Sequence, residues 1–307
     1  MPRAVSYDPQ YTPRNYQRIT VTPLAGALGA EVAGVDVARL DDETFAEIHR
    51  AFLDHLLLLF RDQALSIDEL KGFAGRFGRL KPFPYARGMD GHPEVLEVRS
   101  EPMDSYNFGG GWHSDASFMG EPVTVTAIYA RTVPTPGSDT LFANMYLAYD
   151  TLSDGLKRLI DGLEAIHTAG TFYAPNSAQA QDFVAGHKGT SSILSETANE
   201  ESVQPVAPAH PETGRKVIYV NEAYTVRFKD MTEAESRPLL ETLWRHLSSP
   251  DFTCRIRWQP NALAIWDNRC TQHYALNDYA GQRRLMYRAT ACGAPFAPAP
   301  GLAGGRQ

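Results

Sequence analysis

Apolar residues recur every three or four positions in several stretches of the chain, which predicts helices with one buried face. Ser66 and Glu69 form a capping-box pair in front of one such stretch. Pro238 lies inside another, where we expect it to delay or kink the helix. The predicted helices are 42–56, 67–77, 153–166 and 232–247.

Most of the remaining apolar segments are rich in β-branched and aromatic residues, which predicts strands. Apolar and polar residues alternate along 251–259, so this strand has one buried face and one exposed face. The turn Gln259-Pro260-Asn261 then predicts a hairpin into 262–268. Many antiparallel strands with a few helices are typical of a β-sandwich or a double-sheet jelly roll. The predicted strands are 18–24, 94–100, 123–133, 215–220, 251–259 and 283–290.

Length and charge narrow the class of protein. The chain has 307 residues, 43% of them hydrophobic, a net charge of −7 and no Lys/Arg-rich run, so we expect neither nucleic acid nor a membrane surface as a partner. The longest apolar run, 55–60, is far shorter than the ~20 residues of a membrane helix. The first residues are polar and lack the apolar core of a secretory signal, so we expect a cytoplasmic protein.

No internal repeat or long linker divides the chain, which predicts one domain over 1–307. The first dozen residues and the tail 293–307, rich in Ala, Pro and Gly, are expected to be flexible. The three cysteines show no CxxC spacing, which argues against a disulfide framework or a zinc knuckle.

The segment GGGWHSDASFMG brings a histidine and a carboxylate together. His113 and Asp115 are two residues apart, so on a strand they would share one face and could bind one metal ion. An isolated pair of this kind is more typical of a loop histidine that is hydrogen-bonded to a local carboxylate. The preceding run Gly109–Gly111, which allows positive φ or a close backbone approach, favours a site.

A second polar cluster near the C-terminus contains His273, Arg284 and Arg288. On a strand, Arg284 and Arg288 share one face. A buried arginine cannot lose its charge and needs an anion or a carboxylate beside it, so two on one face would form a receptor for two anionic groups. The alternative is a solvent-exposed strand face whose charges point outward.

Taken together, these segments resemble the taurine dioxygenase and 2,4-D dioxygenase family of iron(II)- and 2-oxoglutarate-dependent oxygenases. The resemblance covers nearly the whole chain and implies a double-stranded β-helix, a mainly β jelly roll with added helices that is closed around one iron ion. The motifs that carry it, in the family's order, are RITVTPLAGALGAEVAGVD, WHSDASF, GSDTLFANMYLAYDTLS, HPETGRKVIYVNEAYTVRF, WDNRCTQHY and RRLMYRATACG.

By this resemblance, His113, Asp115 and His273 bind iron(II) as a facial triad, which leaves positions open for 2-oxoglutarate and O₂. Arg284, eleven residues after His273, and Thr140 in GSDTLF are implied to hold the distal carboxylate of 2-oxoglutarate. The implied reaction converts 2-oxoglutarate to succinate and CO₂ and hydroxylates an unactivated carbon. Cleavage of a carbon–heteroatom bond follows where that carbon carries a leaving group.

The resemblance also implies an anionic substrate. Arg288 matches an arginine that holds the sulfonate in the taurine enzyme; the alternative is an ion pair with Asp267 or Asp278. Gly109 stands where the taurine enzyme has a substrate-contacting asparagine, and 80–88 has no counterpart of its taurine-contacting histidine. We therefore expect a small carboxylate or sulfonate with an apolar body larger than that of taurine.

Three aromatic residues, Phe83, Tyr85 and Tyr224, are candidate walls of the substrate pocket, although aromatic packing is the more usual role. The polar, small-residue-rich segment 171–205 is typical of a lid that orders over a ligand, or of a permanently disordered insertion. His167 and His210 are expected to be structural.

Two other classes of function stay open at this point. The oligomeric state is also open, and a homo-oligomer is possible. A zinc hydrolase could use the same three ligands, but it would not need Arg284 and Thr140 placed for a dicarboxylate. A non-catalytic jelly-roll binding protein would be expected to lose one of the three ligands.

Overall fold

The computed structural model describes residues 15–106, 108–121 and 123–296, and most of its strands belong to one eight-stranded sheet. Strands β2 and β3 pair in parallel, while the other ladders of this sheet are antiparallel. The strand order is β1 (Thr20–Pro23), β2 (Ala30–Ala33), β3 (Leu57–Phe60), β12 (Leu263–Asp267), β6 (Val125–Thr132), β14 (Arg284–Cys292) and β4 (Arg79–Leu80), with β5 (Val95–Ser100) also on β14.

Two three-stranded antiparallel sheets contain the other described strands. Along the chain, β11 lies in a small sheet, β12 in the large sheet and β13 in the small sheet again. Side chains from the two sheets can therefore meet in the space between them. The small sheets are β11 (Thr253–Ile256), β7 (Thr140–Asn144) and β13 (Thr271–Ala275), and β10 (Thr225–Phe228), β8 (Glu164–Thr168) and β9 (Glu201–Pro205).

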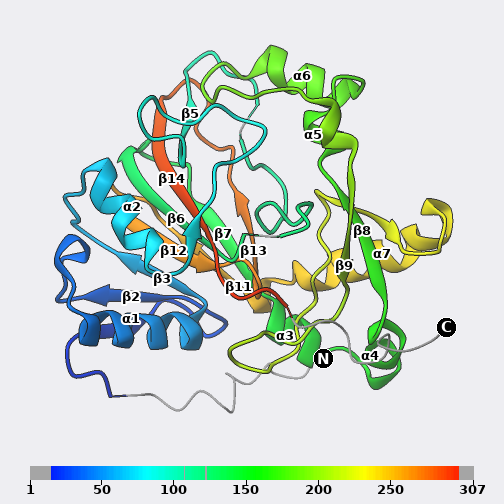
Figure 1. Ribbon diagram of the computed structural model, residues 1–307, viewed down its shortest axis with the longest axis horizontal. Helices are drawn as coiled ribbons and strands as arrows, with labels where there is room; N and C mark the ends of the chain where they lie inside the picture. Colours follow the sequence, from blue (N-terminus) through cyan, green and yellow to red (C-terminus); the bar gives the residue numbers. More distant parts are fainter. Residues whose placement is uncertain (1–14, 107, 122, 297–307) are drawn as a thin grey trace.

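The large sheet is buried on both faces, as β3 shows. Leu58 and Phe60 belong to a core that includes side chains from helices α1 and α2. Leu57 and Leu59 belong to a second core, shared with Phe142 of the small sheet. Alternate residues of the apolar run thus face opposite sides, which explains why this strand shows no polar alternation. Figure 1 shows α1 and α2 beside this sheet and α7 on the opposite side of the molecule.

Local end signals determine where the longer helices begin. Ser66 and Glu69 form the predicted capping box, and Thr232 and Glu235 form a second one. The helices are α1 (Asp42–His55), α2 (Ile67–Gly75), α3 (Met145–Asp150), α4 (Asp154–Ile160), α5 (Gly170–Tyr173), α6 (Ala178–Gly186) and α7 (Glu233–Leu247), with 3₁₀ turns η1 (Val37–Arg39), η2 (Glu196–Asn199) and η3 (Pro250–Phe252).

The end of one predicted helix and the expected delay at Pro238 need correction. The helix predicted over 153–166 ends at Ile160, because the chain turns at Gly162, whose φ is 87°, and continues as strand β8. The helix predicted over 232–247 is confirmed as α7, and Pro238 does not delay its start. The capping box starts α7 at Glu233, and the proline lies within the helix.

Strands β1, β5, β6, β11 and β14 confirm the corresponding predictions, and 251–259 alternates between buried and exposed side chains as expected. The segment 215–220 is not a strand. Its backbone is buried but bonds irregularly, with Val217 N–H donating to Pro208 and Tyr219 N–H to Val206. The hairpin predicted after 251–259 is also wrong, because β11 pairs with β7 whereas β12 pairs with β3 and β6.

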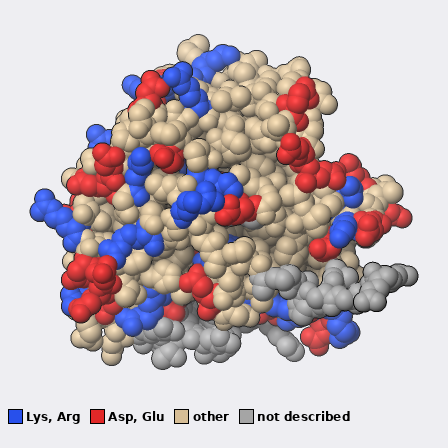
Figure 2. Space-filling model, viewed as in Figure 1, with Lys and Arg blue, Asp and Glu red and all other residues tan. Residues whose placement is uncertain are grey.

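None of the described helices is long and apolar enough to cross a membrane. On the face of the molecule shown in Figure 2, acidic and basic side chains are interspersed. The net negative charge is therefore not gathered into a single patch on that face.

The described start of the predicted flexible tail is packed. Phe296 lies edge-on to Tyr219, with 4.7 Å between ring centroids. The rest of that tail, 297–307, and the first dozen residues lie outside the described part of the chain.

Candidate active site

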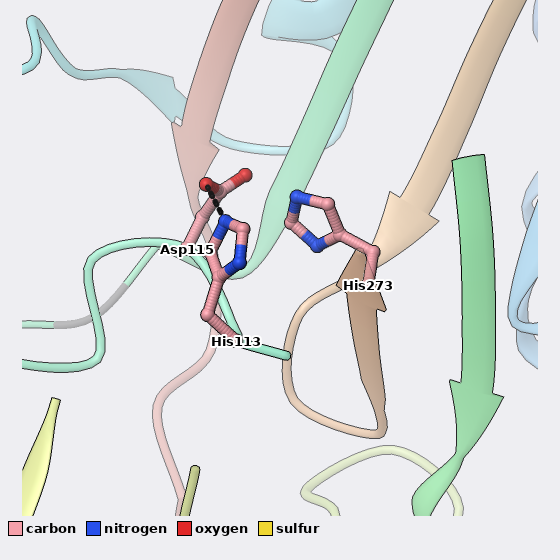
Figure 3. A group of neighbouring side chains, drawn as sticks. All are labelled: His113, Asp115 and His273. Atoms are coloured by element: carbon pink, nitrogen blue, oxygen red, sulfur yellow. Dashed lines mark ion pairs between the residues drawn. The ribbon is translucent and has the colours of Figure 1, made fainter. Parts of the chain in front are cut away.

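His113, Asp115 and His273 direct their polar atoms toward one point (Figure 3). One ligand atom from each lies within 4.8 Å of the others, and all three residues are buried. His113 Nε2 is 3.7 Å from Asp115 Oδ1, and the two imidazole centroids are 4.1 Å apart. Two imidazoles and a carboxylate grouped in this way suit iron(II) and leave part of its coordination sphere open.

The backbone brings the two histidines together directly. His113 N–H donates to the carbonyl of His273 at 3.1 Å, and His273 N–H donates back at 2.8 Å. This is an isolated bridge, and Asp115 lies in a turn, so the pair does not share a regular strand as predicted. Gly109 and Gly111 have φ values of 84° and 140°, which confirms the expected need for glycine beside the pair.

The protonation states suit metal binding. Burial lowers the pKa of His113 and lowers that of His273 to about 3, so both imidazoles are neutral near pH 7. Burial alone would raise the pKa of Asp115, but the nearby Arg288 guanidinium, the two histidines and a hydrogen bond from Thr126 lower it to about 2. A metal ion needs neutral imidazole and ionised carboxylate ligands, and the site supplies both.

A backbone contact determines which ring nitrogen of His113 carries the proton. Nδ1 lies 2.8 Å from the carbonyl oxygen of Gly111 and donates to it, because a carbonyl can only accept. The unprotonated Nε2 then faces the carboxylate of Asp115, with its lone pair free for a metal ion.

Arg284 and Thr140 line a small cavity beside the triad. Arg284 is 3% exposed, its Nε has no hydrogen-bond partner among the described residues, and burial lowers its pKa. Thr140 Oγ1 accepts a hydrogen bond of 2.9 Å from the indole of Trp258, which leaves its own proton free to donate. A buried guanidinium with an unmet donor and a free hydroxyl proton fit the distal carboxylate of 2-oxoglutarate.

Trp258 lines this cavity and bonds to Thr140, a role that its sequence context does not indicate. Its signal is its place on the buried face of the alternating segment 251–259. That pattern indicates burial but does not specify which hydroxyl the indole contacts.

A larger cavity of about 310 Å³ is lined by His113 and Asp115 of the triad. Phe83 and Tyr224 line it as predicted. Tyr85 does not line it but stacks on Tyr173, which does, at 5.0 Å between centroids. The lining residues are Phe83, Tyr106, Phe108, Gly109, Gly110, Gly111, His113, Asp115, Phe172, Tyr173, Gln179, Asp182, Phe183, Ala223, Tyr224 and Arg288.

Arg288 lies between the two cavities and lines both. It is buried on the same face of β14 as Arg284, as predicted, and the alternative of a solvent-exposed strand face is wrong. Its Nη1 is 3.2 Å from Asp115 Oδ1, and its guanidinium carbon is 4.8 Å from the ring centroid of Phe83. Its ion-pair partner is therefore Asp115, and neither Asp267 nor Asp278.

The two histidines that the sequence predicts to be structural, His210 and His167, are both buried and hydrogen-bonded. His210 Nε2 lies 3.0 Å from Asp267 Oδ2, and Arg269 donates to both oxygens of the same carboxylate. Cys270 lies close to this pair, but both carboxylate oxygens of Asp267 already accept hydrogen bonds from Arg269. His167 is hydrogen-bonded on both ring nitrogens within a fully buried network.

Helices α5 and α6 of the predicted lid supply part of the larger cavity's wall, including Phe172 and Phe183. The end of the predicted segment does not fit a lid, because β9 pairs with β8 in a sheet. The part that covers the cavity is thus 170–186.

The chain is similar to a known family of enzymes over most of its length. The family model described as "Taurine catabolism dioxygenase TauD, TfdA family" matches residues 20–290. An alkylsulfatase of Acinetobacter baylyi is 31% identical over 290 residues, which cover 94% of this chain and 89% of that protein. The (S)-phenoxypropionate/alpha-ketoglutarate-dioxygenase of Sphingobium herbicidovorans is 31% identical over 279 residues, 90% of this chain and 95% of that one.

Solved structures are also similar to this chain. A taurine dioxygenase from Burkholderia xenovorans superimposes with a TM-score of 0.76 at 32% identity, covering 92% of each chain. AAD-2 in complex with Mn(II) and N-oxalylglycine superimposes with a TM-score of 0.74 at 26% identity, covering 91% of this chain and 99% of that one.

Proposed function

The chain belongs to the TauD/TfdA family of 2-oxoglutarate-dependent dioxygenases, and from this premise we propose that His113, Asp115 and His273 bind its catalytic iron(II). The observation that carries the assignment is the buried group of two neutral imidazoles and one ionised carboxylate. Family membership sets aside both the zinc hydrolase and the non-catalytic binding protein.

Different residues bind the two ends of the cosubstrate 2-oxoglutarate. Arg284 and the hydroxyl of Thr140 would hold the distal carboxylate, and the keto-acid end would bind the metal ion held by the triad. Bound iron(II) supplies the redox chemistry by which 2-oxoglutarate, O₂ and R–H give succinate, CO₂ and R–OH. The protein itself fixes the distance between the metal-binding triad and Arg284, which bind the two ends of 2-oxoglutarate. It also keeps water out of the buried site.

The substrate is a small organic anion with an apolar body. Arg288 binds its carboxylate, sulfonate or sulfate group, and the aromatic residues of the larger cavity contact the rest of the molecule. Gly109–Gly111 leave space beside the metal that a larger side chain would fill. Where the hydroxylated carbon carries an oxygen or sulfur leaving group, the product collapses to a carbonyl compound and the carbon–heteroatom bond breaks.

The fold that supports this site is a double-stranded β-helix within a single catalytic domain. The alternation of β11, β12 and β13 between the small and the large sheet is what such a jelly roll requires. The triad and both arginine anchors then lie between the two sheets, with 170–186 as a lid over the larger cavity.

The metal assignment is tested by succinate release from protein purified under reducing conditions. Turnover should require iron(II), and His113→Ala, Asp115→Ala and His273→Ala should each abolish it. Full activity with zinc in place of iron would refute the assignment.

The substrate assignment is tested by a succinate-release screen of aryloxyalkanoates, alkylsulfonates, alkyl sulfates and taurine, with Arg288→Ala run in parallel. We expect an anion larger than taurine to be the best substrate and Arg288→Ala to remove most of its turnover. Neutral compounds as best substrates, or an active Arg288→Ala variant, would contradict the proposal.

A further inference from the structure

One oxygen of the Asp115 carboxylate has a dedicated hydrogen-bond donor. Thr126 Oγ1 lies 2.7 Å from Asp115 Oδ2, and Thr126 is fully buried on strand β6. The other oxygen, Oδ1, faces His113 Nε2 at 3.7 Å and accepts a hydrogen bond from Arg288 Nη1 at 3.2 Å. The two oxygens of the carboxylate are therefore in different environments.

The direction of the Thr126 hydrogen bond is fixed by Asn268. The Nδ2 group of Asn268 donates to Thr126 Oγ1 at 2.8 Å, so the hydroxyl accepts there and directs its own proton elsewhere. An ionised carboxylate can only accept, so that proton goes to Asp115 Oδ2.

The orientation of the Asn268 side chain is itself fixed by two donors. Its Oδ1 accepts from the indole N–H of Trp266 at 3.0 Å and from the backbone N–H of Asp115 at 3.2 Å. Neither group can act as an acceptor, so the amide cannot be reversed without leaving both donors facing an NH₂ group. Asn268 thus supports Asp115 through its backbone and, by way of Thr126, through its carboxylate.

Rigid elements hold this network in place. Strands β12 and β6 pair Trp266 with Thr126, and Asn268, which directly follows β12, donates its backbone N–H to Thr124. Asn268 belongs to the motif WDNRCTQHY, which also contains His273. The motif therefore contributes a metal ligand and, five residues before it, a support for another ligand.

We propose that Thr126 and Asn268 are positioning residues that hold Asp115 Oδ2 and so direct Oδ1 toward the metal ion. The proposal rests on the proposed iron site. Neither residue contacts the metal; both act by limiting the orientations of the carboxylate before the metal binds. In other metal sites, removal of a partner of this kind typically weakens metal binding by about 10- to 100-fold.

The test measures the Kd of Mn(II), titrated without oxygen or substrate into metal-free protein, for wild type and variants. Thr126→Val keeps the shape of the side chain and removes the donor, so it should weaken Mn(II) binding by about 10- to 100-fold. Thr126→Ser keeps the hydroxyl and should restore wild-type affinity. Thr124→Val is the matched control, because Thr124 is also buried and its hydroxyl donates to Ala291 rather than to Asp115.

The outcomes separate this inference from the proposed function. If wild type binds Mn(II), Asp115→Ala does not, and Thr126→Val binds as wild type does, the positioning role is refuted while the metal site stands. If Asp115→Ala binds Mn(II) as tightly as wild type, both proposals fail. Thermal melting monitors folding, and Thr126→Ala, expected to lose affinity in the same direction, decides the question if Thr126→Val does not fold. Equal losses in Thr126→Val and Thr124→Val would show a general packing effect and refute the specific role.

Discussion

Replacement of Arg284 by methionine should weaken 2-oxoglutarate binding severely and yet leave the ligand-free protein no less stable. Burial lowers the pKa of Arg284, and its Nε has no partner among the described residues. The protein's own described groups therefore do not satisfy this donor, and burial of the charge carries a desolvation cost. Methionine fills similar space without a charge, and such replacements of buried charges are often neutral or stabilising.

The cost appears when 2-oxoglutarate binds. Removing one partner of a buried, hydrogen-bonded charge pair costs about 2–5 kcal/mol. With about 1.4 kcal/mol for each tenfold change in affinity, the Kd should rise by a factor between about 30 and several thousand. The Kd of Arg284→Lys for 2-oxoglutarate should lie between those of wild type and Arg284→Met, because an ammonium keeps the charge but cannot form two parallel bonds to a carboxylate.

The assay is calorimetric titration of 2-oxoglutarate into Mn(II)-loaded protein, with thermal unfolding recorded in parallel. Arg283→Met is the matched control, because Arg283 is adjacent in sequence but exposed, 3.7 Å from Glu101. An Arg284→Met variant that binds 2-oxoglutarate as tightly as Arg283→Met would refute the anchor. A variant that melts far below wild type without ligand would refute the reasoning about burial.

Three further predictions concern stability and motion. Burial lowers the pKa of His55 from 6.5 to about 4, so between these pH values the unfolded chain binds a proton that the folded protein does not. His55 alone should lower the free energy of unfolding by about 3 kcal/mol as the pH drops from 6.5 to 4. Denaturant titrations of His55→Gln should therefore show a shallower fall than those of wild type, and equal slopes would contradict this. Arg269→Met should destabilise the fold by about 3–5 kcal/mol in guanidinium titrations, because it leaves the buried carboxylate of Asp267 without its cation; an unchanged midpoint would show that the pair contributes nothing. Cleavage within 170–186 by a protease should slow when 2-oxoglutarate and substrate are bound, and equal rates would count against a lid.

The sequence predicts those features that depend on neighbouring residues or on family motifs. The capping box at Ser66 needs only residues within one turn, and the triad residues occur in motifs with defined spacing. The segment 215–220 shows the limit of composition: its β-branched and aromatic residues indicate burial, but a strand also needs a regular partner. The end of β11 shows the same limit, since a turn signal does not state which sheet the chain enters next.

The supporting residues of the site could not be predicted for a related reason. Thr126 lies in an alternating strand, where threonine is common and carries no functional signal. Its role arises from the register that places it opposite Trp266, which in turn brings Asn268 and Asp115 into reach. Register between strands so far apart in the chain depends on the packing of the whole sheet.

The reciprocal backbone bonds between His113 and His273 close a loop of 160 residues, and this affects how the protein acquires its metal. Closing a flexible loop of that length costs about 4–5 kcal/mol of chain entropy before any contact compensates for it. Contacts between such distant segments form late and make folding slow. In the unfolded chain the two imidazoles are rarely close enough to share an ion, so the metal cannot nucleate folding. The metal binds instead to the completed native state and stabilises it against unfolding by mass action.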